Sequence, residues 1–362
     1  MLIAITAVFH KEDHPADYAL FVKETFSRIA LAHPEHTFIF LTDKTGNTQY
    51  SLINNIAEHY VKAPASNKIT TTYWYDVKTP AILKRLKADL WIQANGIISH
   101  TTRIPQMVFS PDLKNPKRFF TSKKMDGLEA IITTGDGQET AINNRFPAFK
   151  GKILTIQMPA DTVFQPADWQ LKERIKDGNT DGREYFFYAG GTANESNAIM
   201  LLKAFSLFKK WQQSNMKLLI ADKSVHKNSS FLEKLQSYKY REDVVIIKRP
   251  KKQFFAQLMA SAYAFIELGV EDKFAPTIYA AFQTETALIA AEAGLVPELA
   301  GKAALYINER DQDMLAQHML SLYKNEIQKS VLIEEGKKML SGISWDRTAA
   351  RIGQLLDEFT QK

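Results

Sequence analysis

Cysteine is absent from this 362-residue sequence, which excludes disulfide bonds and any metal site built on thiolate ligands. The chain also has no apolar run near the roughly 20 residues that a membrane-spanning helix needs. Its opening residues, MLIAITAVFHKEDHP, have neither a basic n-region nor a small-residue cleavage site, so they predict a buried strand rather than a signal peptide. Zinc-ligand spacings and Walker motifs are missing too. These absences suit a cytoplasmic protein.

What the sequence does contain is enough apolar material for a large core and a mild excess of positive charge. Hydrophobic residues make up 45% of the chain, and its length favours two domains. Lysine and arginine together number 46 against 40 aspartates and glutamates, which gives a formal net charge of +6. Such mild basicity is compatible with anionic nucleotides, anionic lipid headgroups or nucleic acid, and it selects none of them.

Short apolar runs rich in β-formers alternate with amphipathic helical segments along the chain. LIAITAVF (2–9) and TFIFLTD (37–43) are predicted strands, and YALFVKETFSRIALA (18–32) between them is a predicted helix. This alternation predicts an α/β fold with doubly wound parallel sheets covered by helices on both faces. In such sheets ligands bind beyond the carboxyl ends of the strands, so we look for chemistry in the loops that follow the strands.

A change of composition predicts the domain boundary. Residues 161–184 are rich in Pro, Asp and Gly and have little apolar periodicity, so we assign them as a linker. An N-terminal Rossmann-like domain is then expected over 1–160 and a C-terminal Rossmann-like domain over 185–345. A closing helix over 346–362 is expected to pack back toward the first domain.

Four stretches in the second half of the chain carry recognisable motifs in a fixed order. They are YFFYAGGTANESNAIMLLKAF (185–205), the segment 244–282 that ends in EDKFAPTIYAAF, the segment 286–323 that begins with TALIAAEAGLVPELAG, and SWDRTAARI (344–352). Together they resemble the retaining glycosyltransferases of the GT-B fold, in the group-1 family that uses nucleotide-sugar donors. The first half resembles that family only in its general pattern.

The resemblance implies a GT-B fold, with two Rossmann-like domains facing across a cleft. It implies an enzyme that transfers a hexose from a UDP- or GDP-linked sugar to a glycan or lipid-linked acceptor, with retention and without a metal or other cofactor. The process implied is the assembly of cell-surface polysaccharide or glycoconjugates. One alternative is a degenerate member that binds a nucleotide, a sugar or a partner enzyme and catalyses no transfer. Another keeps the architecture and binds a different phosphorylated ligand, since fold does not fix function.

The resemblance also assigns a donor site. The leaving diphosphate must be met by cations and helix N-termini when no metal is present. Glu271 or Asp272 would hold the sugar hydroxyls at the reacting centre, while Lys248 or Arg249 would reach the diphosphate. The other expected donor-binding residues are Gly190, Gly191, Thr192, Asn194, Lys273, Phe274 and Thr277.

Several positions depart from the family pattern. Gly191 stands where the family has an arginine, and Ser196 stands where it has a lysine. Ala280, with Tyr279 beside it, occupies the place of a second glutamate that would hold the ribose. The loss of one phosphate-binding cation should cost about 1.5–3 kcal/mol of charged hydrogen bonding. Any activity is therefore expected to depend on substituted residues.

Two further segments suggest an acceptor-side site and a contact with the membrane. His10 and Asp13 follow the first predicted strand and are the acceptor-side candidates, with solvated loop residues as the alternative. His10 and His14 are four apart, but they lie in a loop with Pro15, so no metal is expected there. The segment KNPKRFFTSKK (114–124) places five cations around two phenylalanines, which suits the inner face of the cell membrane or a solvated loop. Nucleic acid is not an expected partner, because no recognition module is visible.

Overall fold

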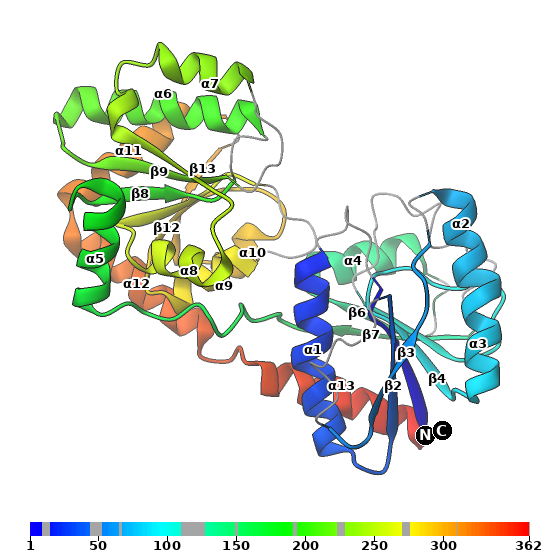
Figure 1. Ribbon diagram of the computed structural model, residues 1–362. Coiled ribbons are helices and arrows are strands. Elements are labelled where there is room, and N and C mark those ends of the chain that lie inside the picture. Colours follow the sequence, from blue (N-terminus) through cyan, green and yellow to red (C-terminus); the bar gives the residue numbers. More distant parts are fainter. Residues whose placement is uncertain are drawn as a thin grey trace. The chain divides into compact units, whose positions relative to one another are not determined.

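The computed structural model separates into two compact units (Figure 1). It describes residues 1–8, 15–43, 53–64, 67–109, 127–147, 149, 151–190, 194–222, 229–269, 276–308 and 310–361. The first unit consists of Met1–Met158 together with Ile343–Lys362, and the second consists of Pro159–Gly342. Each unit is an α/β sandwich with its own sheet and its own hydrophobic core.

The first unit contains a seven-stranded sheet in the order β3-β2-β1-β4-β5-β6-β7, and every pairing is parallel. Its strands are β1 (Leu2–Thr6), β2 (Thr37–Thr42), β3 (Ile56–Tyr60), β4 (Leu90–Gln93), β5 (Gln106–Phe109), β6 (Leu128–Thr133) and β7 (Lys152–Thr155). Its helices are α1 (Pro15–Ala32), α2 (Lys68–Tyr73), the π-helical turn η1 (Trp74–Lys78), α3 (Thr79–Leu86), α4 (Asp136–Arg145) and α13 (Trp345–Thr360).

The second unit contains a six-stranded sheet in the order β10-β9-β8-β11-β12-β13, again with parallel pairings throughout. Its strands are β8 (Tyr185–Tyr188), β9 (Lys217–Asp222), β10 (Val244–Lys248), β11 (Ala264–Glu267), β12 (Ala287–Ala291) and β13 (Ala304–Ile307). Its helices are α5 (Trp169–Thr180), α6 (Glu195–Gln212), α7 (Ser229–Gln236), the 3-10 turn η3 (Arg241–Asp243), α8 (Lys252–Ala260), α9 (Pro276–Gln283), α10 (Val296–Ala300), α11 (Gln312–Lys324) and α12 (Glu326–Leu340).

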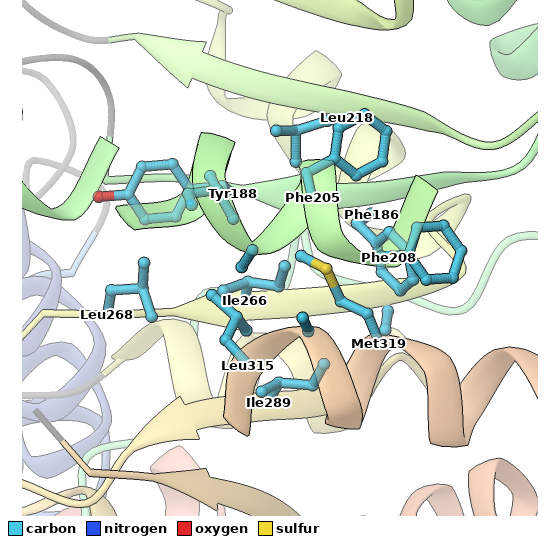
Figure 2. Packing of buried hydrophobic residues seen from close by; sticks show 14 of the residues in the cluster. Phe186, Tyr188, Phe205, Phe208, Leu218, Ile266, Leu268, Ile289, Leu315 and Met319 are labelled. Atoms are coloured by element: carbon cyan, nitrogen blue, oxygen red, sulfur yellow. The ribbon is translucent and has the colours of Figure 1, made fainter. Parts of the chain in front are cut away.

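Most of the strands are largely apolar because both faces of each sheet are covered, whereas the edge strand β3 (IAEHY) is polar in part and partly exposed. In the second unit, alternate strand residues such as Phe186 and Ile266 pack against Phe205 and Met319 of α6 and α11 on one face (Figure 2). On the other face, Phe187 packs against Phe255 of α8 with ring centroids 5.3 Å apart. Burial on two faces explains why these strands are continuous hydrophobic runs instead of alternating polar and apolar residues. The predicted α/β fold with two parallel sheets is confirmed.

The last helix returns to the first unit. The hydroxyl of Ser344 caps α13 by accepting a hydrogen bond from the Arg347 backbone N–H at 3.1 Å. Arg28 of α1 donates to the Asp346 carboxylate at 2.7 Å, and α1 and α13 lie side by side in Figure 1. The Thr348 hydroxyl donates to the carbonyl of Gln157 at 2.8 Å. The expected packing of the closing helix on the first domain is therefore confirmed.

The segment that composition assigned to a linker has structure of its own. Residues 161–184 contain α5, which begins where the Asp168 carboxylate accepts a hydrogen bond from the Leu171 N–H at 2.7 Å. The helix ends at Asp181, which has a left-handed backbone with φ of 54°. Ile175 of α5 is buried in the second unit. Together with the N-cap Asp168 and the C-cap Asp181, this buried side chain stabilises a helix that has few apolar residues. Within the described ranges, no helix is both long enough and apolar enough to span a membrane.

Leu356→Ala should destabilise the first unit, because Leu356 of α13 is fully buried. The loss of its buried methyl groups should lower the free energy of unfolding by about 2–5 kcal/mol, measured by urea denaturation. Arg351→Ala on the exposed face of the same helix is the matched control, with an expected change within about 0.5 kcal/mol. Equal effects of the two substitutions would contradict the docking of α13 through its buried face.

Candidate functional site

The strand order of the second unit reverses direction between β8 and β11. Chain order runs from β8 outward to β9 and β10 on one side, and from β11 to β12 and β13 on the other. The loops that leave the carboxyl ends of β8 and β11 therefore diverge to opposite sides of the sheet. This divergence is the topological switch point at which doubly wound sheets bind ligands.

At the end of β8, the Tyr188 side chain lies directly over Gly190. A Cβ atom at position 190 would collide with the hydroxyl and ring of Tyr188, so only glycine allows the tyrosine to lie there. Burial raises the pKa of the Tyr188 hydroxyl, and the nearby Glu267 carboxylate raises it further, whereas a hydrogen bond with Asn197 lowers it. Tyr188 therefore stays neutral and presents a fixed hydroxyl at the switch point.

Helix α6 begins beside this tyrosine. Its cap is Asn194, whose side-chain oxygen accepts a hydrogen bond from the Asn197 backbone N–H at 3.2 Å, and Ser196 is exposed in the first turn. The Asn197 side chain donates to the carbonyl of Leu268, in the loop after β11, at 2.8 Å. The Asn197 side-chain amide thus connects the first turn of α6 to the loop after β11, at the positive end of the α6 dipole.

The loop after β11 is held by a buried carboxylate. Glu267 is only 6% exposed and accepts hydrogen bonds from the Gly269 N–H and from the Thr277 hydroxyl, each at 2.9 Å. Gly269 lies at the start of the loop and Thr277 lies in the first turn of α9. Glu267 therefore links Gly269 with Thr277, which lie before and after the expected sugar-binding acids in the chain; those acids lie outside the described residues.

Lys248 and Arg249 lie at the same sheet edge but farther along it. Both are exposed, and Lys248 is the last residue of β10, where it pairs in register with Asp222 of β9. The Arg249 N–H donates to the Asp222 carbonyl at 2.7 Å, and Arg249 has a left-handed backbone with φ of 47°. Since β10 is two strands from β8, its end is about 10 Å from the Tyr188–Gly190 turn, a span that a long cationic side chain can largely cover.

Helix α9 buries Ala280, which stands where the family pattern has a second glutamate. Ala280 is 1% exposed and lies within the core of the helix packing. The hydroxyl of the neighbouring Tyr279 is buried and has no hydrogen-bond partner among the residues that the structure describes. Burial raises the Tyr279 pKa, and the Glu298 carboxylate contributes to the shift.

Many of the residues assigned from sequence lie outside the described ranges. These are Gly191, Thr192, Glu271, Asp272, Lys273, Phe274, His10, Asp13 and the basic segment 114–124. The structure does place Gly190, Asn194 and Thr277 at the switch point, and it places Lys248 and Arg249 along the same edge.

In the first unit the corresponding edge is organised by an asparagine. The Asn95 amide, in the turn after β4, donates to the Val8 carbonyl after β1 at 3.2 Å and to the Tyr75 hydroxyl. The Asp76 carboxylate accepts a hydrogen bond from the His100 backbone N–H at 2.7 Å. Val8 is the last described residue before the acceptor-side candidates, so these contacts show only how the neighbouring part of this edge is held.

Sequence reasoning missed three of the residues that build the donor-side edge. Glu267 is a charged residue inside the apolar run AYAFIELGV, and an acid in such a place usually has a buried partner, so a signal was present. Tyr188 and Asn197 gave no such signal, because their roles depend on a contact between loops about 70 residues apart.

Comparison with known structures identifies the architecture. The chain is similar to a glycosyltransferase from Rickettsia africae ESF-5, with a TM-score of 0.75 at 12% sequence identity over 100% of this chain and 99% of that one. It is similar to HepE from Anabaena in complex with UDP and glucose, with a TM-score of 0.68 at 12% identity over 100% and 99% of the two chains. A sucrose-phosphate synthase from Thermosynechococcus elongatus gives 0.71 at 13% identity over 100% and 99%. The chain therefore has the GT-B fold.

The family assignment rests on the second unit. Residues 170–339 match the family described as glycosyl transferases group 1, and this range includes every strand of the second sheet. The second unit is thus a group-1 glycosyltransferase domain, and the family resemblance seen in the sequence is confirmed. A search of curated protein sequences returned no significant match. The family supports glycosyl transfer from a nucleotide sugar as the general activity.

Gly190→Ala should displace the Tyr188 hydroxyl and with it the tie through Asn197. We expect a loss of about 1–3 kcal/mol in the free energy of unfolding from the forced overlap, together with weaker nucleotide binding. The control is Gly178→Ala in α5, where a new Cβ meets open space and helix propensity predicts a small gain. A Gly190→Ala protein with unchanged stability and unchanged nucleotide affinity would show that this turn is not packed as described.

Proposed function

We propose that this chain transfers a hexose from a UDP- or GDP-linked sugar to a glycan or lipid-linked acceptor, with retention of anomeric configuration and without a metal. The observation that carries the proposal is the match of the second unit to group-1 glycosyltransferases. Among the structural neighbours, HepE was solved with UDP-glucose and WaaG is a glycosyltransferase of lipopolysaccharide biosynthesis. The proposed process is the assembly of surface polysaccharide or glycoconjugate.

The diphosphate would bind to the N-terminus of α6 and to a cation at the end of β10, away from the positions where the family has its cations. The first turn of α6 offers backbone N–H groups and the positive end of the helix dipole beside Gly190. Lys248 or Arg249 would supply the charge that Gly191 and Ser196 lack, by reaching along the edge from β10. Charge of this kind lowers the barrier because it stabilises the leaving diphosphate as it forms.

The sugar would be held by Glu271 or Asp272. In the chain these acids lie between Gly269 and Thr277, which both donate hydrogen bonds to the Glu267 carboxylate. Ordered neighbouring residues reduce the conformational entropy that is lost on ligand binding. Glu267 is in this account a positioning residue, and the acids of the loop contact the substrate.

A second candidate function is binding without transfer. The observation in its favour is the apolar surroundings of Ala280, which is 1% exposed where the family's second glutamate would lie. A protein that has lost a ribose-binding carboxylate and two phosphate-binding cations can keep the fold and bind a nucleotide, a sugar or a partner enzyme. Transfer and binding differ in whether the sugar–phosphate bond is broken.

We place the reaction in the cytoplasm, at the inner face of the cell membrane. The cations and phenylalanines of 114–124 support contact with anionic lipid headgroups, which would bring the enzyme to a lipid-linked acceptor. His10 and Asp13 are the proposed acceptor-side residues.

Calorimetric titration with UDP, GDP and their sugars tests nucleotide binding. One nucleotide should bind, and Lys248→Ala or Arg249→Ala should weaken its affinity by about tenfold, the value of one lost charged hydrogen bond. Lys210→Ala is the matched control, because this exposed lysine lies in the last turn of α6, away from the carboxyl edge. No binding of any nucleotide at millimolar concentration would exclude the transferase, and unchanged affinity in both variants would reject the phosphate assignment.

Donor hydrolysis separates the enzyme from the binder. If a bound nucleotide sugar is cleaved, nuclear magnetic resonance of the first-formed sugar should show the anomeric configuration of the donor. The rate should not change when Mg²⁺ or Mn²⁺ is added. Binding without cleavage would favour the second candidate, and inversion or a requirement for added metal would contradict the proposed mechanism.

A further inference from the structure

Two histidines and an aspartate meet at the opposite edge of the first sheet. His33 lies just after α1, His36 immediately precedes β2, and Asp357 is in the last part of α13. One ligand atom from each lies within 4.8 Å of the others. Asp357 is far from both histidines in sequence, and the return of α13 to the first unit brings its carboxylate to the imidazoles.

The distances fit the edges of a small coordination polyhedron. His33 Nδ1 is 3.5 Å from Asp357 Oδ1 and 3.3 Å from Glu35 Oε1, and His36 Nε2 is 3.7 Å from the same Glu35 oxygen. In a tetrahedral zinc site with bonds of about 2.0–2.1 Å, neighbouring ligand atoms are about 3.4 Å apart. Three ligand pairs of such a four-ligand site are close to that spacing, and His36 lies within 4.8 Å of His33 and Asp357. The exposed carboxylates of Asp357 and Glu35 would move toward the imidazoles when an ion binds.

The histidines are held by their surroundings. The His36 ring is 6% exposed, and it stacks on the His33 ring with centroids 5.8 Å apart and planes 11° apart. The backbone of Gly353 in α13 packs against His33, where an added Cβ would lie 3.1 Å from Nε2. His33 Nδ1 is thus the nitrogen that faces the carboxylates. His36 Nδ1 lies 3.5 Å from the Met1 amino group, which leaves Nε2 for the same side.

The turn that carries both histidines is fixed by one asparagine. The Asn55 side-chain amide lies within hydrogen-bonding distance of three carbonyls of this turn, those of Ala30, His33 and His36, at 2.9, 3.1 and 3.0 Å. Support of this kind holds metal ligands in place before the ion arrives, which increases affinity.

We propose that His33, His36 and Asp357 form a Zn²⁺ site, with the exposed carboxylate of Glu35 as the fourth ligand. Imidazole nitrogens with carboxylates suit Zn²⁺, whereas Mg²⁺ and Ca²⁺ prefer sites built from oxygen alone. The site lies at the amino end of β2, opposite the carboxyl edge at which ligands bind to such sheets. The ion is structural: it links the α1–β2 turn to α13 and stabilises the first unit. This role does not depend on the proposed transferase activity.

Titration of metal-free, tag-free protein with ZnCl₂ tests the site. Calorimetry should show one Zn²⁺ per chain, and thermal unfolding should shift upward with added Zn²⁺, because an ion that binds only the folded state stabilises it. Asp357→Ala should weaken binding at least tenfold and reduce the thermal shift at a given Zn²⁺ concentration. Its side chain is 48% exposed, so this variant should fold normally. His36→Ala should lose binding entirely.

His59→Ala is the matched control, since His59 of β3 belongs to the same unit but not to the cluster. It should keep both the stoichiometry and the thermal shift. Replacement of Zn²⁺ by Co²⁺ should add visible absorption typical of four-coordinate cobalt, and Asp357→Ala should reduce it. Absence of stoichiometric binding would overturn the proposal, as would binding that Asp357→Ala and His36→Ala leave unchanged. In those cases the cluster is only a set of ion pairs.

Discussion

Parallel strand pairing is the constraint on which the rest of this molecule depends. Because every strand pair in the two sheets is parallel, all the strands of a sheet end at the same edge, and the helices must cross from that edge back to the other. In the second unit this brings Tyr188, Asp222, Lys248 and Glu267 to one edge, although they come from four different strands. The candidate donor site is a consequence of this arrangement.

The buried carboxylate of Glu267 then orders the described residues at this edge. An acid as buried as Glu267 is costly unless it is hydrogen-bonded, and here it accepts hydrogen bonds from the start of the loop after β11 and from the first turn of α9. On the other side of the switch point, Asn197 ties α6 to the same loop. Hydrogen bonds thus join the end of β11, the start of α6 and the start of α9.

The elements were predictable from sequence, because two-face burial makes the strands of a parallel sheet into continuous apolar runs such as KLLIAD and ALIAA. The GT-B architecture followed from the order of motifs. The contacts that shape the candidate sites were not predictable. Asn197 and Leu268, or His33 and Asp357, meet only through tertiary packing, and residue spacing carries no signal for such contacts. Helix α5 lies in the segment expected to be a linker, because its few apolar residues do not recur at the 3.6-residue spacing of an amphipathic helix.

The candidate donor site differs from the family pattern in charge, and its described backbone is ordered by neighbouring side chains. Gly190 is required by the Tyr188 side chain, and the α6 N-terminus is capped by Asn194. Lys248 and Arg249 are the described cations nearest in strand order along that edge, at the end of β10. A site of this kind would bind the diphosphate with fewer direct charges and would depend more on oriented backbone groups.

Hydrogen–deuterium exchange with and without UDP or GDP is the most direct test of where a nucleotide binds. The account predicts slower exchange in peptides covering the end of β8 with the start of α6, and the end of β11 with the start of α9. Peptides at the amino edge of the second sheet should be unaffected. Protection confined to the first unit, or none at saturating nucleotide, would contradict the assignment of the donor site to the carboxyl edge of the second unit.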